Sequence, residues 1–142
     1  MTTRTKSLNF AKSMKRAGIH LHRGYASGTR DAWYKLNQDY AAQAAAGELV
    51  RYAFTTVQGE YNWREYGAMQ IYAGVMVDGY DQDGPVYDEV AALAEAAGLA
   101  VSREVSDGMH FLTLYKSAAQ RDIDERRKRD AARLLRLRDK AS

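Results

Sequence analysis

The feature that most restricts the fold is a two-residue turn signal between two apolar runs. Asp107-Gly108 separates residues 99–105 from residues 109–115, and both runs are rich in strand-forming side chains. An Asp-Gly pair favours the type I′ turn, whose twist matches that of two antiparallel strands. We therefore expect a hairpin in which Val105 lies opposite His110.

Periodic apolar side chains predict the remaining elements. Helices are expected over residues 7–17, 30–46, 85–97 and 117–140, strands over 19–22, 49–57 and 63–77, and a loop over 23–29. Strands that follow one another through hairpins form antiparallel sheets. The predicted fold class is α+β: an antiparallel sheet of four to five strands with helices packed on one face and a long C-terminal helix.

The length of 142 residues suits one domain. Residues 1–116 are expected to form this α+β domain, with a basic N-terminal helix and loop. Residues 117–142 are expected to form a basic helix that packs on the domain or projects from it. The chain has no cysteine, which excludes disulfides, thiolate zinc sites and a cysteine nucleophile. No apolar run is long enough for a membrane span or a secretory signal, so we expect a cytoplasmic protein without membrane contact.

Charge is segregated along the chain, although the net charge is only +3. Residues 1–30 carry seven basic and no acidic side chains, and residues 117–142 carry nine basic and five acidic ones. Residues 31–116 between them carry five basic and thirteen acidic side chains. Opposed blocks of this kind shape the local field of a protein more than its net charge does. Two basic ends are typical of a protein that binds a polyanion, provided that the acidic centre does not neutralise them.

The candidate nucleic-acid-binding residues come from these two ends. Basic side chains would contact phosphates, and Tyr25 could stack on a base. The candidates are Lys12, Lys15, Arg16, Arg23, Tyr25, Arg30, Arg126, Arg127, Arg129 and Arg133.

Two other interpretations of the last helix stay open at this point. It could be a solvated face neutralised by its own ion pairs, Asp122–Arg126, Glu125–Arg129 and Asp130–Arg133, which have helical spacing. It could also bind a partner helix, because Leu134, Leu135 and Leu137 cluster near its end.

An acidic, tyrosine-rich segment over residues 78–95 gives a rival hypothesis. Its candidate partner-binding residues are Asp81, Asp83, Tyr87 and Asp88. Tyrosines are frequent at interface hot spots, and an acidic face complements a basic one. Under this hypothesis the protein is an inhibitor that docks this face into the basic groove of a protein partner.

A small metal-dependent enzyme is the third class that we considered. His20 and His22 alternate on one predicted strand, so both rings point to one face, and His110 could complete a zinc site from a neighbouring strand. The sequence contains no recognised nucleophile or metalloprotease motif. We therefore expect no catalytic residues, no metal and no cofactor.

The leading expectation is a small non-enzymatic regulator, of the phage or mobile-element type. It would engage nucleic acid or a nucleoprotein complex through its basic N-terminal and C-terminal segments.

Overall fold

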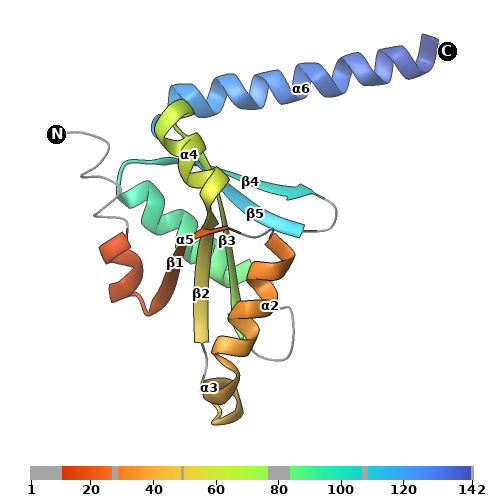
Figure 1. The fold of residues 1–142 in the computed structure, drawn as a ribbon. Helices are drawn as coiled ribbons and strands as arrows, with labels where there is room; N and C mark the ends of the chain where they lie inside the picture. Colours follow the sequence, from red (N-terminus) through yellow and green to blue (C-terminus); the bar gives the residue numbers. More distant parts are fainter. Residues whose placement is uncertain (1–10, 27–28, 49, 77–83, 107–108, 142) are drawn as a thin grey trace.

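The computed structural model describes residues 11–26, 29–48, 50–76, 84–106 and 109–141, and a five-stranded sheet forms its centre (Figure 1). The strands are β1 (Ile19–Tyr25), β2 (Val50–Thr56), β3 (Ala68–Met76), β4 (Ala100–Ser106) and β5 (Met109–Tyr115). They lie side by side in the order β1-β2-β3-β5-β4. β1 runs parallel to β2, whereas each of the other pairs is antiparallel. The sheet is therefore mixed, and the expectation of a purely antiparallel sheet was wrong.

Helices fill the connections between the strands. They are α2 (Thr29–Asp39), α3 (Ala41–Ala45), α4 (Val57–Tyr66), α5 (Gly84–Ala96) and α6 (Ala118–Ala141). Residues 11–16 are also helical and precede β1. The parallel pairing of β1 and β2 follows from α2 and α3, because a parallel pair needs a long crossover between its strands. Within the described residues, no helix is both long enough and apolar enough to cross a lipid bilayer.

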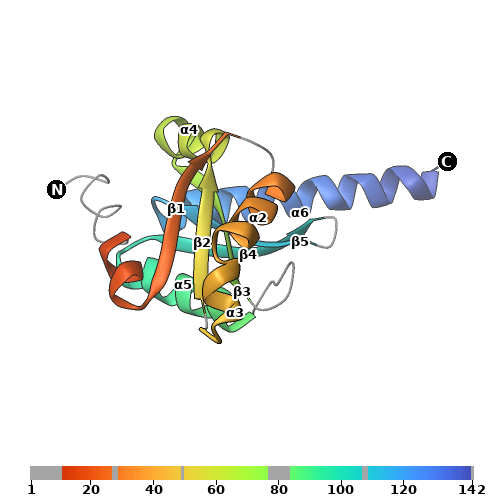
Figure 2. The ribbon, with the colours of Figure 1, turned by 60° about the horizontal axis from the view of Figure 1, so that its bottom comes forward.

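Helices cover both faces of the sheet, and not one face as expected. Alternate side chains of β2 point to opposite faces. Trp33 and Leu36 of α2 pack in one buried cluster with Phe54 of β2. Ala53 of β2 belongs to a second cluster, which includes Val90 of α5. Figure 2 shows α2 and α5 on the two sides of the sheet.

α4 is the element that the sequence did not predict. The expectation was strand over residues 63–77. Instead, the side chain of Thr56 accepts a hydrogen bond from the N–H of Gly59 (3.0 Å) and caps a helix that ends at Gly67. Gly67 has φ of 72°, a left-handed conformation that favours glycine at the end of a helix. Only the second half of the predicted strand is therefore strand.

Other predicted elements are present, some of them with different bounds. Val105 pairs with His110 in the β4–β5 hairpin, whose turn residues lie outside the described residues. α5 spans Gly84–Ala96, close to the predicted helix. β1 begins at Ile19 as expected but continues to Tyr25, so the predicted loop begins later than expected. The helix predicted over 30–46 is divided into α2 and α3.

Candidate nucleic-acid interface

α6 begins where Ser117 caps its first turn. The hydroxyl of Ser117 accepts a hydrogen bond from the backbone N–H of Gln120 (3.2 Å). The side-chain amide of Gln120 donates to the carbonyl of Tyr66 (3.2 Å), at the end of α4. The start of α6 is therefore fastened to α4, 54 residues away in the sequence.

The first three turns of α6 are also tied to the sheet by polar side chains. Tyr115 of β5 donates its hydroxyl hydrogen bond to Asp124. Ser102 of β4 donates to Glu125 (2.6 Å). Lys128 forms ion pairs with Glu104 of β4 and with Asp124 (3.1 Å for the latter). These contacts fix the direction in which the remainder of α6 leaves the body.

The pKa values of these groups reflect the same contacts. Burial and the hydrogen bond to Asp124 raise the pKa of Tyr115 to about 12. Desolvation lowers the pKa of Lys128, but the bonds to Glu104 and Asp124 outweigh it and raise the pKa above its usual value. Desolvation raises the pKa of Asp124, but the bonds from Tyr115 and Lys128 leave it lowered. The lysine and the aspartate therefore stay charged at neutral pH, and the tyrosine stays protonated.

From Arg126 to Lys140 every side chain of α6 is exposed, and the helix projects away from the body (Figure 1). This stretch carries eight basic and two acidic side chains. The exposed Leu134, Leu135 and Leu137 lie in the same stretch. The sequence left open whether the helix packs or projects, and α6 does both: its first turns pack and its last four turns project.

The arginines are not spread evenly around this projecting helix. At about 100° per residue, positions separated alternately by three and four residues fall on one side of a helix. Five basic residues follow this spacing, and we call them the basic stripe: Arg126, Arg129, Arg133, Arg136 and Lys140. They lie within an arc of about 80° and extend about 21 Å along the axis. Neither acidic residue of the stretch falls inside that arc.

Arg127, a predicted phosphate contact, lies on a different side of the helix. It falls about 140° from the middle of the basic stripe, and Arg138 about 160°. Arg127 lines a cavity of about 330 Å³ beside Tyr66 and Tyr115, on the α4 side of α6. The helical spacing therefore places Arg127 on a different side from Arg129 and Arg133, although Arg126 and Arg127 both line a second cavity with Asp122 and Asp130. The spacing also adds Arg136 and Lys140 to the predicted residues, and the same rule could have found them in the sequence.

The alternative interpretation of α6, a solvated face neutralised by its own ion pairs, can be compared with the contacts of the described residues. Among the described residues, no ion pair joins Asp122 to Arg126, Glu125 to Arg129 or Asp130 to Arg133. Asp122 lies instead beside Arg121 (3.2 Å), and Glu125 is bonded to Ser102. The basic stripe therefore keeps its positive charge unpaired within the part of the chain that the structure describes.

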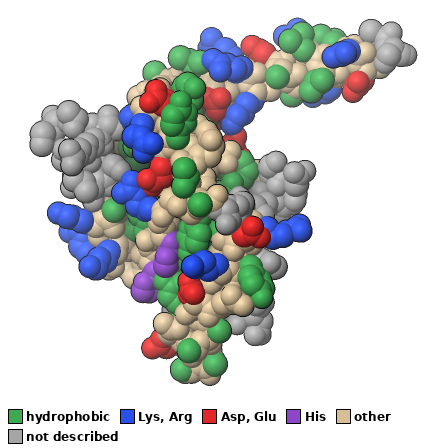
Figure 3. Space-filling model, viewed as in Figure 1, with side chains coloured by type: hydrophobic (Ala, Val, Ile, Leu, Met, Phe, Trp, Pro, Cys, Tyr) green, Lys and Arg blue, Asp and Glu red, His purple; other side chains and the backbone are tan. Residues whose placement is uncertain are grey.

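The basic residues near the N-terminus lie elsewhere. Lys12, Lys15 and Arg16 are exposed on the helical residues 11–16, and Arg30 is exposed at the start of α2. Figures 1 and 2 place residues 11–16 and the free end of α6 at opposite ends of the molecule. Figure 3 shows basic side chains along α6 and at the left edge of the body, with only scattered basic side chains between them. The two basic ends do not form one continuous surface among the described residues.

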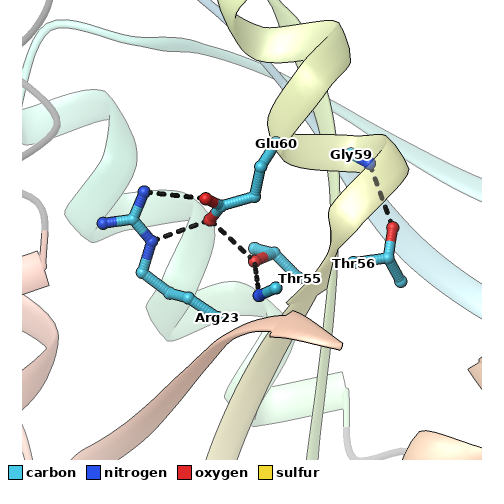
Figure 4. Close-up of polar contacts among 6 residues, drawn as sticks. Arg23, Thr55, Thr56, Gly59 and Glu60 are labelled. Atoms are coloured by element: carbon cyan, nitrogen blue, oxygen red, sulfur yellow. Dashed lines mark hydrogen bonds and ion pairs between the residues drawn. The ribbon is translucent and has the colours of Figure 1, made fainter. Parts of the chain in front are cut away.

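Arg23 and Tyr25, the remaining predicted contacts, are engaged within the fold. Arg23 forms a bidentate ion pair with Glu60 of α4 (Figure 4). Tyr25 is half-buried and packs edge-on against Phe54, with ring centroids 5.7 Å apart. Neither side chain is a free contact for a nucleic acid in this arrangement.

The acidic face is only partly visible in the structure. Asp81 and Asp83 lie outside the described residues. Tyr87 is 3% exposed and donates its hydroxyl hydrogen bond to the carbonyl of His110, so it belongs to the core. Asp88 is exposed and pairs with Arg103 of β4.

The three histidines do not meet. His20 and His22 point to the same face of β1, as expected, and both rings lie against Tyr40. His110 is on β5, which β2 and β3 separate from β1, so the neighbouring strand that a three-histidine site needs is not there. Within the described residues, no group of three side chains is placed to hold a metal ion.

Comparison with known protein families, curated proteins and solved structures gives no match to this chain.

Proposed function

We propose that this protein binds the phosphate backbone of a nucleic acid through the basic stripe of α6. One observation supports this proposal above the others: five cationic side chains share one side of a helix that projects from the body, and no acidic side chain lies among them. An arrangement of this kind matches a linear polyanion, because it presents positive charge along a line about 21 Å long.

Electrostatics favours the contact for two reasons. Four of the five residues are arginines, whose planar guanidinium groups can donate two hydrogen bonds to one phosphate. Each phosphate that is neutralised also releases condensed counterions, which is the main source of such affinity.

Backbone contacts of this type carry no sequence information. We therefore propose binding that is largely independent of sequence, with dissociation constants on the order of 10⁻⁴–10⁻⁶ M at physiological salt. The basic residues of the N-terminal end lie on a separate surface and are not needed for this contact.

A second candidate function follows from the exposed leucines of α6. Leu137 lies next to the basic stripe and is 53% exposed, and Leu134, about 120° from the middle of the stripe, is 65% exposed. A protein partner that combines an acidic and an apolar surface would fit them. A second copy of the chain fits less well, because pairing two such helices would bring two positive segments together.

The test uses two variants of the full chain that lose the same charge from different sides of α6. Arg129→Gln/Arg133→Gln removes two members of the basic stripe, and Arg127→Gln/Arg138→Gln removes two arginines outside it. Fluorescence anisotropy with labelled duplex DNA and single-stranded RNA should show about tenfold weaker binding for the first variant and a much smaller change for the second. Circular dichroism checks that both keep their helix.

Two outcomes contradict the proposal. If both variants weaken binding equally, net charge and not the stripe carries the interaction. If the wild-type protein binds neither probe at low salt, α6 is not a phosphate-binding helix, and the protein-partner function takes its place.

A further inference from the structure

A groove runs along the open edge of β1. β1 is the last strand in the sheet order, so one side of its backbone faces away from β2. Among the described residues, no backbone hydrogen bond outside the sheet uses that side of the strand. The backbone N–H and C=O groups of every second residue of β1 therefore point away from β2.

The groove is a cavity of about 590 Å³ with walls from two separate elements. Its floor is β1 from Ile19 to Arg23. Ala11 and Lys15 of the helical residues 11–16 form one wall, and Tyr40 after α2 forms the other. An extended peptide can bind to an open strand edge of this kind as an added strand, with its side chains between the helix and the aromatic ring.

The wall formed by Tyr40 is held in place by histidines of the strand itself. The hydroxyl of Tyr40 is hydrogen bonded to Nε2 of His22 (2.6 Å), and the ring of Tyr40 also contacts His20. These contacts fix the width of the groove before any ligand arrives, which lowers the cost of ordering on binding.

The groove has a defined end. Ile19 to His22 pair in regular register with β2, but the register shifts between His22 and Tyr25. Within this irregular part, the N–H of Gly24 donates to the hydroxyl of Thr55 (3.2 Å). A bulge of this kind bends a strand and interrupts the regular alternation of its outward backbone groups, although pairing with β2 resumes at Tyr25 and Thr56. Only the part of β1 before the bulge can accept another strand.

The charged side chains that line the groove are both basic. They are Lys15 and Arg23, and no aspartate or glutamate is among its described lining residues. Arg23 is paired with Glu60, and Asp39 lies near enough to His22 to act on it electrostatically. Lys15 is exposed and has no ion pair among the described residues. The complementary ligand is therefore acidic.

We propose that β1 accepts an extended acidic peptide segment of a partner protein as an added strand, at a site separate from the basic stripe. A peptide backbone offers donors and acceptors in alternation and can satisfy both kinds of outward group on β1. A phosphate offers only acceptors and would leave the carbonyls of the strand unpaired, so neither a nucleic acid nor a free phosphate suits this edge.

The probe is a fluorescein-labelled peptide of about six residues that alternates glutamate and valine. Two control peptides carry methyl groups on every second backbone nitrogen, in complementary patterns. The protein should bind the unmodified peptide, and one of the two methylated peptides should bind about tenfold more weakly than the other, because only one pattern removes the donors that face β1. Hydrogen exchange of the β1 amides should slow in the complex.

Two lysines of residues 11–16 provide matched variants. Lys15→Glu places a negative charge in the wall of the groove and should weaken peptide binding about tenfold, whereas Lys12→Glu alters an exposed lysine that does not line it. The Arg129→Gln/Arg133→Gln variant should bind the peptide normally, which separates this site from the proposed function.

Three results overturn the proposal: no binding of the unmodified peptide, equal binding of both methylated peptides, or displacement of the peptide by a single-stranded oligonucleotide in the Arg129→Gln/Arg133→Gln variant. The last result would assign the groove to nucleic acid.

Discussion

Arg23 and Glu60 join the edge strand β1 to the first turns of α4 through two parallel contacts, Nε to Oε1 at 2.7 Å and Nη2 to Oε2 at 3.1 Å. Thr55 donates a third hydrogen bond to the same carboxylate (3.0 Å). Partial burial raises the pKa of Glu60, but the hydrogen bonds from Arg23 and Thr55 and the charges of Arg23 and Arg64 outweigh it, so the pKa lies below its usual value.

A pH dependence of stability follows from the lowered pKa of Glu60. The ionised carboxylate of Glu60 adds to the free energy of unfolding at pH values above the pKa that this group has in the unfolded chain. The added stability is lost as the pH falls through the lower pKa that Glu60 has in the folded protein. We expect Glu60→Gln to cost about 1 kcal/mol of unfolding free energy near neutral pH and much less in acid. Urea unfolding at several pH values measures this, with Glu65→Gln, an exposed glutamate of the same helix, as the control. A cost for Glu60→Gln that does not change with pH would contradict the account.

The junction between α4 and α6 depends on the absence of a side chain at Gly67. A Cβ atom there would lie 2.4 Å from Nε2 of Gln120, and the φ of 72° disfavours other residues. Gly47 has a similar φ of 86° but open space around it. Gly67→Ala should therefore destabilise the protein by about 1 kcal/mol more than Gly47→Ala, because only the first change also displaces Gln120. Equal losses in thermal unfolding would show that the contact with Gln120 contributes nothing.

Tyr115 holds the first turns of α6 against the sheet through its hydrogen bond to Asp124. Tyr115→Phe should cost about 1–2 kcal/mol, because it removes a bond to a charged group from a buried position. The phenolate absorbance that the wild type has and this variant lacks should titrate with a pKa of about 12. A midpoint at the ordinary tyrosine value would mean that the hydroxyl is not bonded as described.

The basic stripe needs a continuous helix as well as its charges. Ala132 is exposed in the projecting part of α6, so Ala132→Pro should break the helix there without changing the thermal unfolding of the body. Nucleic-acid affinity should fall about tenfold although no charge is lost. Ala132→Gln keeps the helix and should bind normally. If the proline variant binds as tightly as the wild type, the alignment of the stripe is unimportant.

Local features of the fold could be read from the sequence, whereas the sheet order could not. The Asp107-Gly108 turn and the Ser117 cap act over a few residues, and the hairpin and α6 follow from them. The pairing of β1 with β2 brings together residues that are about 30 positions apart, and no local pattern specifies it. That pairing decides that helices cover both faces and that the histidines of β1 are far from His110.

α4 was missed because its composition resembles that of a strand. Tyr61, Trp63 and Tyr66 favour strands by propensity, but the cap at Thr56 and the stop at Gly67 decide the local structure. In the candidate interface, the spacing of the basic stripe was present in the sequence. The contact of Lys128 with Glu104, 24 residues away, could not be read from the sequence. It is one of the contacts that fix the direction in which α6 leaves the body.

The salt dependence of nucleic-acid binding tests the central claim most directly. For the wild type on duplex DNA, the logarithm of the association constant should fall with the logarithm of salt concentration with a slope of about −4, as expected for four to five phosphate contacts. The Arg129→Gln/Arg133→Gln variant should lower the magnitude of that slope by about 2, and Arg127→Gln/Arg138→Gln should leave it nearly unchanged. A slope near zero, or the same slope for all three proteins, would contradict binding through the basic stripe.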